Sequence, residues 1–237
     1  MNNGVFIPIE IMQREYTSKL LLSVELIKRG MPVIIGHKSS VFKLALESKE
    51  PGILFYKSSK NKAFETLIKK KFGIVAQDEE AGIVYKHFED FYKFRHSLGL
   101  IGKLNLFFTW GKDEYSFLTK KFDKNIVKNY GALRSCFWGD FGKKLYQKKI
   151  NILNKKFGNY ILIVSNFPTY NSYVGKNKLK ELQVNFRGYD PNQPDLLHNN
   201  EKKIFNQYVK LAKILSKQLN KTVIIRPHPG ESLKGWK

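Results

Sequence analysis

Short apolar runs alternate with longer amphipathic segments along the first part of the chain. The apolar runs cover residues 5–10, 31–35, 52–56 and 73–76. They are rich in Val, Ile and Phe, which is typical of buried strands in a parallel sheet. Segments 14–28, 40–47 and 61–72 lie between these runs and read as helices. The alternation predicts an α/β fold with a doubly wound parallel sheet and right-handed crossovers.

The first predicted helix has an apolar row that we expect to face the sheet. Its members are Leu20, Leu21, Val24 and Ile27. The strand before this helix contains Pro8, which has no N–H to donate, so we expect the strand to be blocked there.

The remaining elements extend the alternation into a second unit. Helices are predicted at 85–104, 113–122, 143–156 and 201–219, and strands at 106–111, 160–166 and 223–225. Polar residues 168–200 carry few periodic signals and are interpreted as an inserted loop with short helices. The pattern places an N-terminal domain at 1–142, a linker helix at 143–158 and a second domain at 159–237. One strand–helix–strand unit is too small for a stable sheet, so we expect this second domain to be truncated.

Composition restricts the class of protein. A hydrophobic content of 42% excludes wholesale disorder. The net charge of +22 comes largely from scattered lysines and favours anionic partners: phosphorylated substrates, acidic lipids or nucleic acid. The single Cys136 excludes an internal disulfide and fits a reducing compartment. Signal-peptide and membrane-spanning patterns are absent from the sequence, so we expect a cytoplasmic protein, at most in peripheral contact with the inner membrane surface.

Common cofactor motifs are also absent from the sequence. No G-x-G-x-x-G follows the first strand, so a dinucleotide site is not expected. The five histidines are too dispersed for metal-ligand spacing. We therefore expect no cofactor and no metal held by protein ligands. No base-reading motif is recognisable, which argues against nucleic acid as a partner.

The segment Thr222–Glu231 carries the strongest candidate chemistry. A short β-branched run ends in Arg226-Pro227-His228-Pro229-Gly230, whose prolines and glycine favour a stiff turn. Ligands of open α/β sheets bind outside the carboxyl ends of the strands. Arg226 and His228 suit a phosphate there, with Glu231 beside them. The plainer interpretation is a surface turn with a solvated Arg and a packing His.

Two further groups of charged residues follow predicted strands. Glu10 and Arg14, with Lys19 nearby, surround the first strand–helix junction, and Lys38 follows the second strand. These residues can orient an anionic substrate, or they can be ordinary surface ion pairs that contribute little.

Asp78-Glu79-Glu80 follows the fourth predicted strand. Adjacent carboxylates in a cleft raise one another's pKa, so that one can act as a general base. The alternative is a solvated acidic loop or a helix N-cap. In a chain this basic, we retain all three as candidates, with Glu79 or Glu80 as the base.

A series of motifs, in order along nearly the whole chain, resembles one family. It comprises Ile7-Pro8-Ile9-Glu10, Arg14-Glu15, Val33-Ile34-Ile35-Gly36, Asp78-Glu79-Glu80, Phe108-Thr109-Trp110-Gly111, Asn166-Phe167 with Asn171, and Arg226-Pro227-His228-Pro229-Gly230-Glu231. The series resembles bacterial surface carbohydrate biosynthesis proteins, which are related to capsule transferases and CDP-glycerol glycerophosphotransferases of the glycosyltransferase-B type. The chain departs from the family at Gly131-Ala132-Leu133-Arg134, where a glycine–asparagine–proline–arginine turn is usual.

The resemblance implies two facing Rossmann-like domains and transfer of a sugar or polyol-phosphate from a nucleotide-sugar or CDP-polyol donor to a glycan or lipid-linked acceptor. Glu79 or Glu80 would be the general base, and Arg226 and His228 would bind the donor phosphate, although His228 as the base is also open. Glu10, Arg14, Lys38, Asp78, Asn166 and Glu231 would bind substrate. The alternatives are a basic, non-catalytic module for nucleic acid or anionic membranes, and an inactive fragment.

Overall fold

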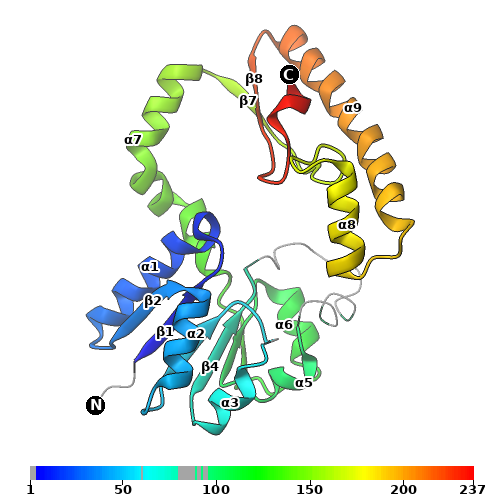
Figure 1. The fold of residues 1–237 in the computed structure, drawn as a ribbon. Helices are drawn as coiled ribbons and strands as arrows, with labels where there is room; N and C mark the ends of the chain where they lie inside the picture. The colour runs from blue at the N-terminus through cyan, green and yellow to red at the C-terminus, as the bar shows by residue number, and fades with distance from the viewer. Residues whose placement is uncertain (1–3, 60, 80–88, 90–91, 93–95) are drawn as a thin grey trace. The chain divides into compact units, whose positions relative to one another are not determined.

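The computed structural model describes residues 4–59, 61–79, 89, 92 and 96–237, which form two compact units (Figure 1). Unit 1 spans Met1–Leu145 and unit 2 spans Tyr146–Lys237. The division falls within helix α7 (Asp140–Phe157), close to the start of the predicted linker helix.

Unit 1 is built on a six-stranded sheet in which all strand pairs are parallel. The strands are β1 (Val5–Ile9), β2 (Val33–His37), β3 (Ile53–Tyr56), β4 (Gly73–Gln77), β5 (Leu106–Phe108) and β6 (Val127–Lys128), in the order β2-β1-β3-β4-β5-β6. The predicted α/β class with a parallel sheet is confirmed, and the arrangement is Rossmann-like.

Helices cover both faces of this sheet. They are α1 (Met12–Lys28), α2 (Lys38–Glu47), α3 (Phe64–Lys69), α5 (Leu98–Ile101), α6 (Lys112–Leu118) and the 3-10 helix η1 (Leu133–Trp138). On one face, strand residues such as Leu54 and Ile74 pack with α2, α3, α5 and α6. On the other face, Ile7 and Phe55 pack with α1 and η1. Most of the helix predicted at 85–104 lies outside the described residues.

Helix α1 presents a different face to the sheet from the one predicted. Leu20, Val24 and Ile27 are exposed. The buried positions are Glu15, Ser18, Lys19 and Ser23, with Leu22 and Leu26 packed on the core. The prediction of the apolar face was wrong because the helix approaches the sheet through small serines and a buried ion pair.

Strand β1 continues past Pro8. The N–H of Val5 donates to Pro32 on the β2 side, and alternation along the strand then places the missing N–H of Pro8 on the β3 side. Pairing with β3 extends only through Val5 and Phe6. Proline is therefore tolerated there, and its carbonyl accepts a hydrogen bond from Lys19 Nζ at 2.8 Å.

Unit 2 contains a parallel two-stranded sheet, β7 (Tyr160–Val164) with β8 (Thr222–Arg226). Along the chain, two long helices, α8 (Lys176–Arg187) and α9 (Gln193–Leu219), connect β7 to β8. The 3-10 helix η2 (Leu233–Trp236) follows β8. Much of the segment interpreted as an inserted loop is therefore helical. Pro194 near the N-terminus of α9 has a fixed φ suited to a helix start.

In the part of the chain that the structure describes, no helix has the length and apolar character needed to cross a membrane.

Candidate functional site

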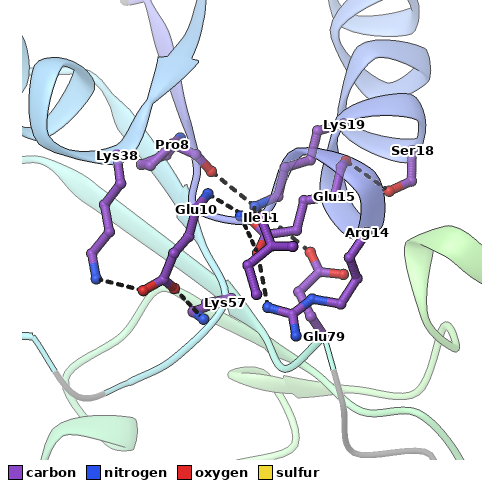
Figure 2. A network of polar contacts seen from close by, with 10 residues as sticks. All are labelled: Pro8, Glu10, Ile11, Arg14, Glu15, Ser18, Lys19, Lys38, Lys57 and Glu79. Carbon is purple, nitrogen blue, oxygen red and sulfur yellow. Dashed lines mark hydrogen bonds and ion pairs between the residues drawn. The ribbon is translucent and has the colours of Figure 1, made fainter. Parts of the chain in front are cut away.

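The carboxyl ends of four neighbouring strands of unit 1 carry charged side chains (Figure 2). Glu10 follows β1, Lys38 follows β2, Lys57 follows β3 and Glu79 follows β4. Parallel strands end at the same edge of a sheet, so these residues share one edge although they are far apart in sequence. Ligands of open α/β sheets bind along this edge.

Glu15, at the start of α1, is the most extensively bonded carboxylate of this edge. It is fully buried and accepts hydrogen bonds from Lys19 Nζ at 2.7 Å, Arg14 Nη2 at 3.0 Å and the backbone N–H groups of Glu10 and Ile11 at 3.1 and 3.3 Å (Figure 2). Burial alone would raise its pKa. The hydrogen bonds and positive charge of Lys19, with the other donors, instead hold the pKa at about 2.

Lys19 is a buried cation between two carboxylates. Its Nζ lies 2.7 Å from Glu15 Oε2 and 3.7 Å from Glu79 Oε1, and it donates to the Pro8 carbonyl. Its side chain is fully shielded from solvent, so it fixes the junction of β1, α1 and the loop after β4. Direct contact with a substrate would require a rearrangement of this junction.

Glu79 has the electrostatics expected of a general base. It is 4% exposed, and burial raises its pKa even though Lys19 and Arg134 act to lower it. A buried carboxylate with a raised pKa takes up a proton more readily at neutral pH than an ordinary one does. Glu80, the other candidate base, lies outside the described residues.

Glu10, Lys38 and Lys57 form the outer, solvent-accessible part of the edge. Glu10 contacts Lys38 Nζ at 3.3 Å and also Lys57. Burial acts to raise the pKa of Glu10, but the hydrogen bonds and charges of Lys57 and Lys38 lower it overall. The two lysines leave a net positive surface around one carboxylate, which favours an anionic ligand.

Asp78 belongs to a buried polar chain. Its Oδ2 lies 3.0 Å from His96 Nε2, and the other ring nitrogen of His96 lies 3.3 Å from Ser59 Oγ. Ser59 also donates to the Ser97 carbonyl and accepts from the Ser97 N–H. All three linked side chains are 2% exposed or less. The geometry joins the loops after β3 and β4; the substrate-binding role of Asp78 remains a prediction.

A further buried carboxylate, Glu114, lies on α6. It accepts hydrogen bonds from the Tyr92 hydroxyl and from the Trp110 N–H, the latter at 2.6 Å. Burial raises its pKa to about 7, since it outweighs these two donors. This group was not predicted from the sequence.

A largely apolar cavity of about 370 Å³ lies on the α1 side of the sheet. Phe55, Phe108 and Leu22 contribute to its walls. Gln77 also lines the cavity; its Nε2 donates a hydrogen bond to the Gly131 carbonyl and its Oε1 accepts one from the Leu133 N–H. Both polar atoms of the Gln77 side chain are therefore bonded to the backbone.

In unit 2, Arg226 and His228 lie where β8 ends. Both are exposed. The Gly230 N–H donates to His228 Nδ1 at 3.0 Å, so the lone pair of Nδ1 is used and the ring proton lies on Nε2. His228 therefore offers Nε2–H as a hydrogen-bond donor. This arrangement favours anion binding over a role as the base.

Glu231 links this turn to the segment after β7 and to η2 through hydrogen bonds. It accepts from Ser165 Oγ at 2.8 Å, from the backbone N–H groups of Phe167 and His228 at 3.0 Å, and from Trp236 Nε1 at 2.8 Å. Burial acts to raise its pKa, but these donors lower it overall. The hydrogen bond from the Gly230 N–H sets the tautomer of His228, whereas Glu231 bonds the backbone N–H groups of Phe167 and His228. Contact of Glu231 with a ligand remains a prediction.

A cavity of about 280 Å³ opens beside the His228 turn. Its lining includes His228, Gly230, Thr169 and Tyr173, together with Gln183 of α8. Asn166, also predicted to bind substrate, is exposed just after β7. Residues from the segment after β7, from α8 and from the turn after β8 thus line one cavity within unit 2.

Sequence reasoning did not select Glu15, Lys57, Glu114 or Gln183 as site candidates. Glu15 carries a signal, because a Glu and a Lys four residues apart on a helix pair with each other and Lys19 is that partner. Lys57 could have been found as the first residue after a predicted strand. Gln183 gave no signal, since it lies in a polar stretch interpreted as loop. Within the described ranges, no three His, Cys, Asp or Glu side chains group as metal ligands.

Fold and site define an α/β protein with a Rossmann-like parallel sheet and charged residues at its carboxyl edge. Comparisons of the chain with protein-family models, with curated proteins and with solved structures gave no match.

Proposed function

We propose that the protein is a transferase that moves a sugar or polyol-phosphate from a nucleotide-activated donor to a surface-polysaccharide acceptor. Its architecture would be two Rossmann-like domains of the glycosyltransferase-B type, as the motif series implies. The observation that carries the proposal is the pair Arg226 and His228 at the end of β8, with the His228 ring held as an Nε2–H donor.

The donor phosphate binds to unit 2 in this proposal. Arg226 supplies a permanent charge and two parallel N–H donors, and His228 Nε2–H adds a further hydrogen bond. As the donor bond breaks, the leaving nucleotide takes the bonding electron pair, and these donors stabilise the charge that develops on its phosphate. The 280 Å³ cavity beside His228 accommodates an adjoining part of the donor.

Unit 1 supplies the acceptor side. Glu79 takes the proton from the acceptor hydroxyl while the hydroxyl oxygen forms the new bond to the transferred group. Its raised pKa suits this role. Lys38 and Lys57 attract anionic groups to the same edge. Lys19 and Glu15 position Glu79 and stay bonded to each other throughout.

Calorimetric titration of cytidine and uridine diphosphates tests the donor site. Arg226→Ala and His228→Ala should each weaken binding about 10–100-fold, the loss expected for a hydrogen bond to a charged group. Lys217→Ala removes an exposed cation from the last turn of α9 and serves as the control. It should leave the affinity unchanged.

Two results would refute the proposal. Equal loss of affinity in Lys217→Ala would show general attraction to a basic surface. Absence of nucleotide binding together with tight, salt-sensitive binding to RNA or anionic vesicles would favour the basic, non-catalytic module.

A further inference from the structure

The cavity of about 370 Å³ in unit 1 lies at the carboxyl ends of strands. Gln77 and Phe108, which line it, are the last residues of β4 and β5, and the lining segment 130–132 follows β6. Leu22 of α1 also lines it. The volume falls within the range of small-ligand sites.

The lining of this cavity is uncharged. Among the described residues, those that line it include no Lys, Arg, His, Asp or Glu. Charged residues make up 26% of the chain, so an uncharged lining sets the cavity apart from the basic surface of the protein. An ionic ligand would lose its hydration in the cavity and would meet no opposite charge there.

The amide and hydroxyl groups of the lining are already bonded to the backbone. Gln77 Nε2 donates to the Gly131 carbonyl at 2.6 Å, and Gln77 Oε1 accepts from the Leu133 N–H at 2.8 Å. Ser135 Oγ donates to the Ala132 carbonyl at 2.6 Å. A ligand rich in hydroxyls would have to compete with these bonds or leave its own groups unpaired. The lining therefore disfavours a sugar.

Aliphatic and aromatic side chains supply the remaining contacts. Phe55 is 7% exposed, and the rings of Phe108 and Tyr130 lie edge to face with their centroids 5.7 Å apart. Apolar cavities of proteins stay dry and take up apolar molecules. A hydrocarbon chain needs no hydrogen-bond partner and gains free energy from each methylene group that leaves water.

We propose that this cavity binds the hydrocarbon chain of a neutral amphiphile. The polar end of the amphiphile stays in water, where the lining residues Tyr130 and Cys136 are exposed. This site is separate from the proposed donor site, because every residue that lines it belongs to unit 1. It therefore holds whether or not Arg226 and His228 bind a nucleotide.

Binding is measured with N-phenylnaphthylamine, a neutral probe whose fluorescence rises in apolar surroundings. A neutral probe is needed because an anionic dye would bind to a chain of net charge +22 elsewhere. The wild-type protein should enhance the fluorescence, and hexanol, octanol and decanol should displace the probe. Their affinities should rise about four-fold for each added methylene group until the cavity is full. Absence of enhancement, or affinities that do not change with chain length, would overturn the inference.

Two tryptophan variants of α1 locate the bound probe. Leu22→Trp fills the cavity and should weaken probe binding ten-fold or more. Leu20→Trp places the same side chain at an exposed position of the same helix, outside the lining, and should leave binding unchanged. Equal affinities in the two variants would show that the probe binds elsewhere and would overturn the inference.

Alkylation of Cys136 locates the ligand in the wild-type protein, also if Leu22→Trp does not fold. Cys136 is the single cysteine of the chain and lines the cavity. Burial raises the pKa of its thiol, so iodoacetamide is used in mildly alkaline buffer. Saturating decanol should slow the alkylation several-fold. An unchanged rate at a decanol concentration that displaces the probe would place both ligands elsewhere and refute the site.

Decanol and decyl maltoside, the latter below its critical micelle concentration, distinguish two sources of the chain. Displacement of the probe by both would indicate a chain that enters while attached to a large headgroup, as in a lipid. Displacement by decanol alone would indicate a small free ligand. Either result supports the apolar site, and displacement by neither overturns it. Nucleotide titrations test the proposed function separately, so the failure of one proposal is distinguishable from the failure of the other.

Discussion

Replacing Lys19 by methionine should destabilise unit 1 strongly at neutral pH. The change keeps an unbranched side chain of similar length and removes the cation that lies 2.7 Å from Glu15 and 3.7 Å from Glu79. Both carboxylates would then stay buried, with Arg14 as the remaining cation against Glu15. Removing one partner of a buried ion pair typically costs about 3–5 kcal/mol.

The pKa of Glu15 gives a second measure of the same energy. A decrease from 4.5 to about 2 corresponds to about 3 kcal/mol of stability, shared among Lys19, Arg14 and the two backbone donors. In the wild type this stability is present above pH 4.5 and is lost as the pH falls toward 2. Without Lys19, the group that lowers the pKa of Glu15 most is lost, so this pKa should rise and acidification should restore part of the variant's stability. The difference from wild type should therefore shrink between pH 7 and pH 4.

Urea unfolding measures both effects. A Trp236→Phe background leaves Trp110 and Trp138 as the fluorescent reporters, and both belong to unit 1. Lys28→Met on the same helix is the matched control, because Lys28 pairs with Glu25 at 3.0 Å on the exposed surface and should cost less than about 1 kcal/mol. Equal losses in the two variants at pH 7, or a Lys19→Met loss that grows on acidification, would refute the buried-pair reasoning.

Three further predictions concern stability. Burial raises the pKa of Glu114 to about 7, so this carboxyl should cost wild type up to about 3 kcal/mol as the pH rises from 4.5 to 7. In urea unfolding, Glu114→Gln should remove this contribution and leave the decrease that comes from Glu79, whose pKa is also raised; an unchanged pH profile would contradict the prediction. Gly52→Ala should lower the free energy of unfolding by about 1–3 kcal/mol, because the added Cβ would lie 2.6 Å from the Gly4 carbonyl oxygen. In Gly99→Ala the added Cβ meets open space, so this control should cost nothing; equal Tm values for the two variants would count against the packing argument. Glu231→Gln should lower the stability of unit 2 by about 2 kcal/mol, because its amide nitrogen would face hydrogen-bond donors; an unchanged Tm would show that these contacts carry little energy.

The sequence predicted strands β1 to β5 of unit 1 well because each is a short apolar run, β-branched or aromatic, between helical segments. It also predicted that Glu10, Lys38 and Glu79 follow strands, and the parallel sheet then brings them to one edge. It did not predict which side of α1 is buried. Periodicity identifies an apolar row, whereas burial of Lys19 depends on contacts with Pro8 and Glu79 from other elements.

Unit 2 shows the same limit. The strand before Arg226 was evident from Val223 and its neighbours, and the turn from its prolines. Helix α8 was not predicted because its residues are mostly polar, and the place of Gln183 in the cavity lining follows only from the folded chain. The tautomer of His228 likewise depends on a local backbone contact, from Gly230, that composition does not reveal.

The two carboxylates around Lys19 differ in a way that bears on the proposed chemistry. Glu15 receives the short Lys19 contact, Arg14 and two backbone donors, and its pKa falls to about 2. Glu79 has the longer Lys19 contact, and its burial raises its pKa. Environments that push two pKa values apart separate a permanent charge from a group that can exchange a proton. Glu15 is thus fixed as the structural anion that keeps Lys19 in place, and Glu79 is the one of the two suited to accept a proton from a substrate.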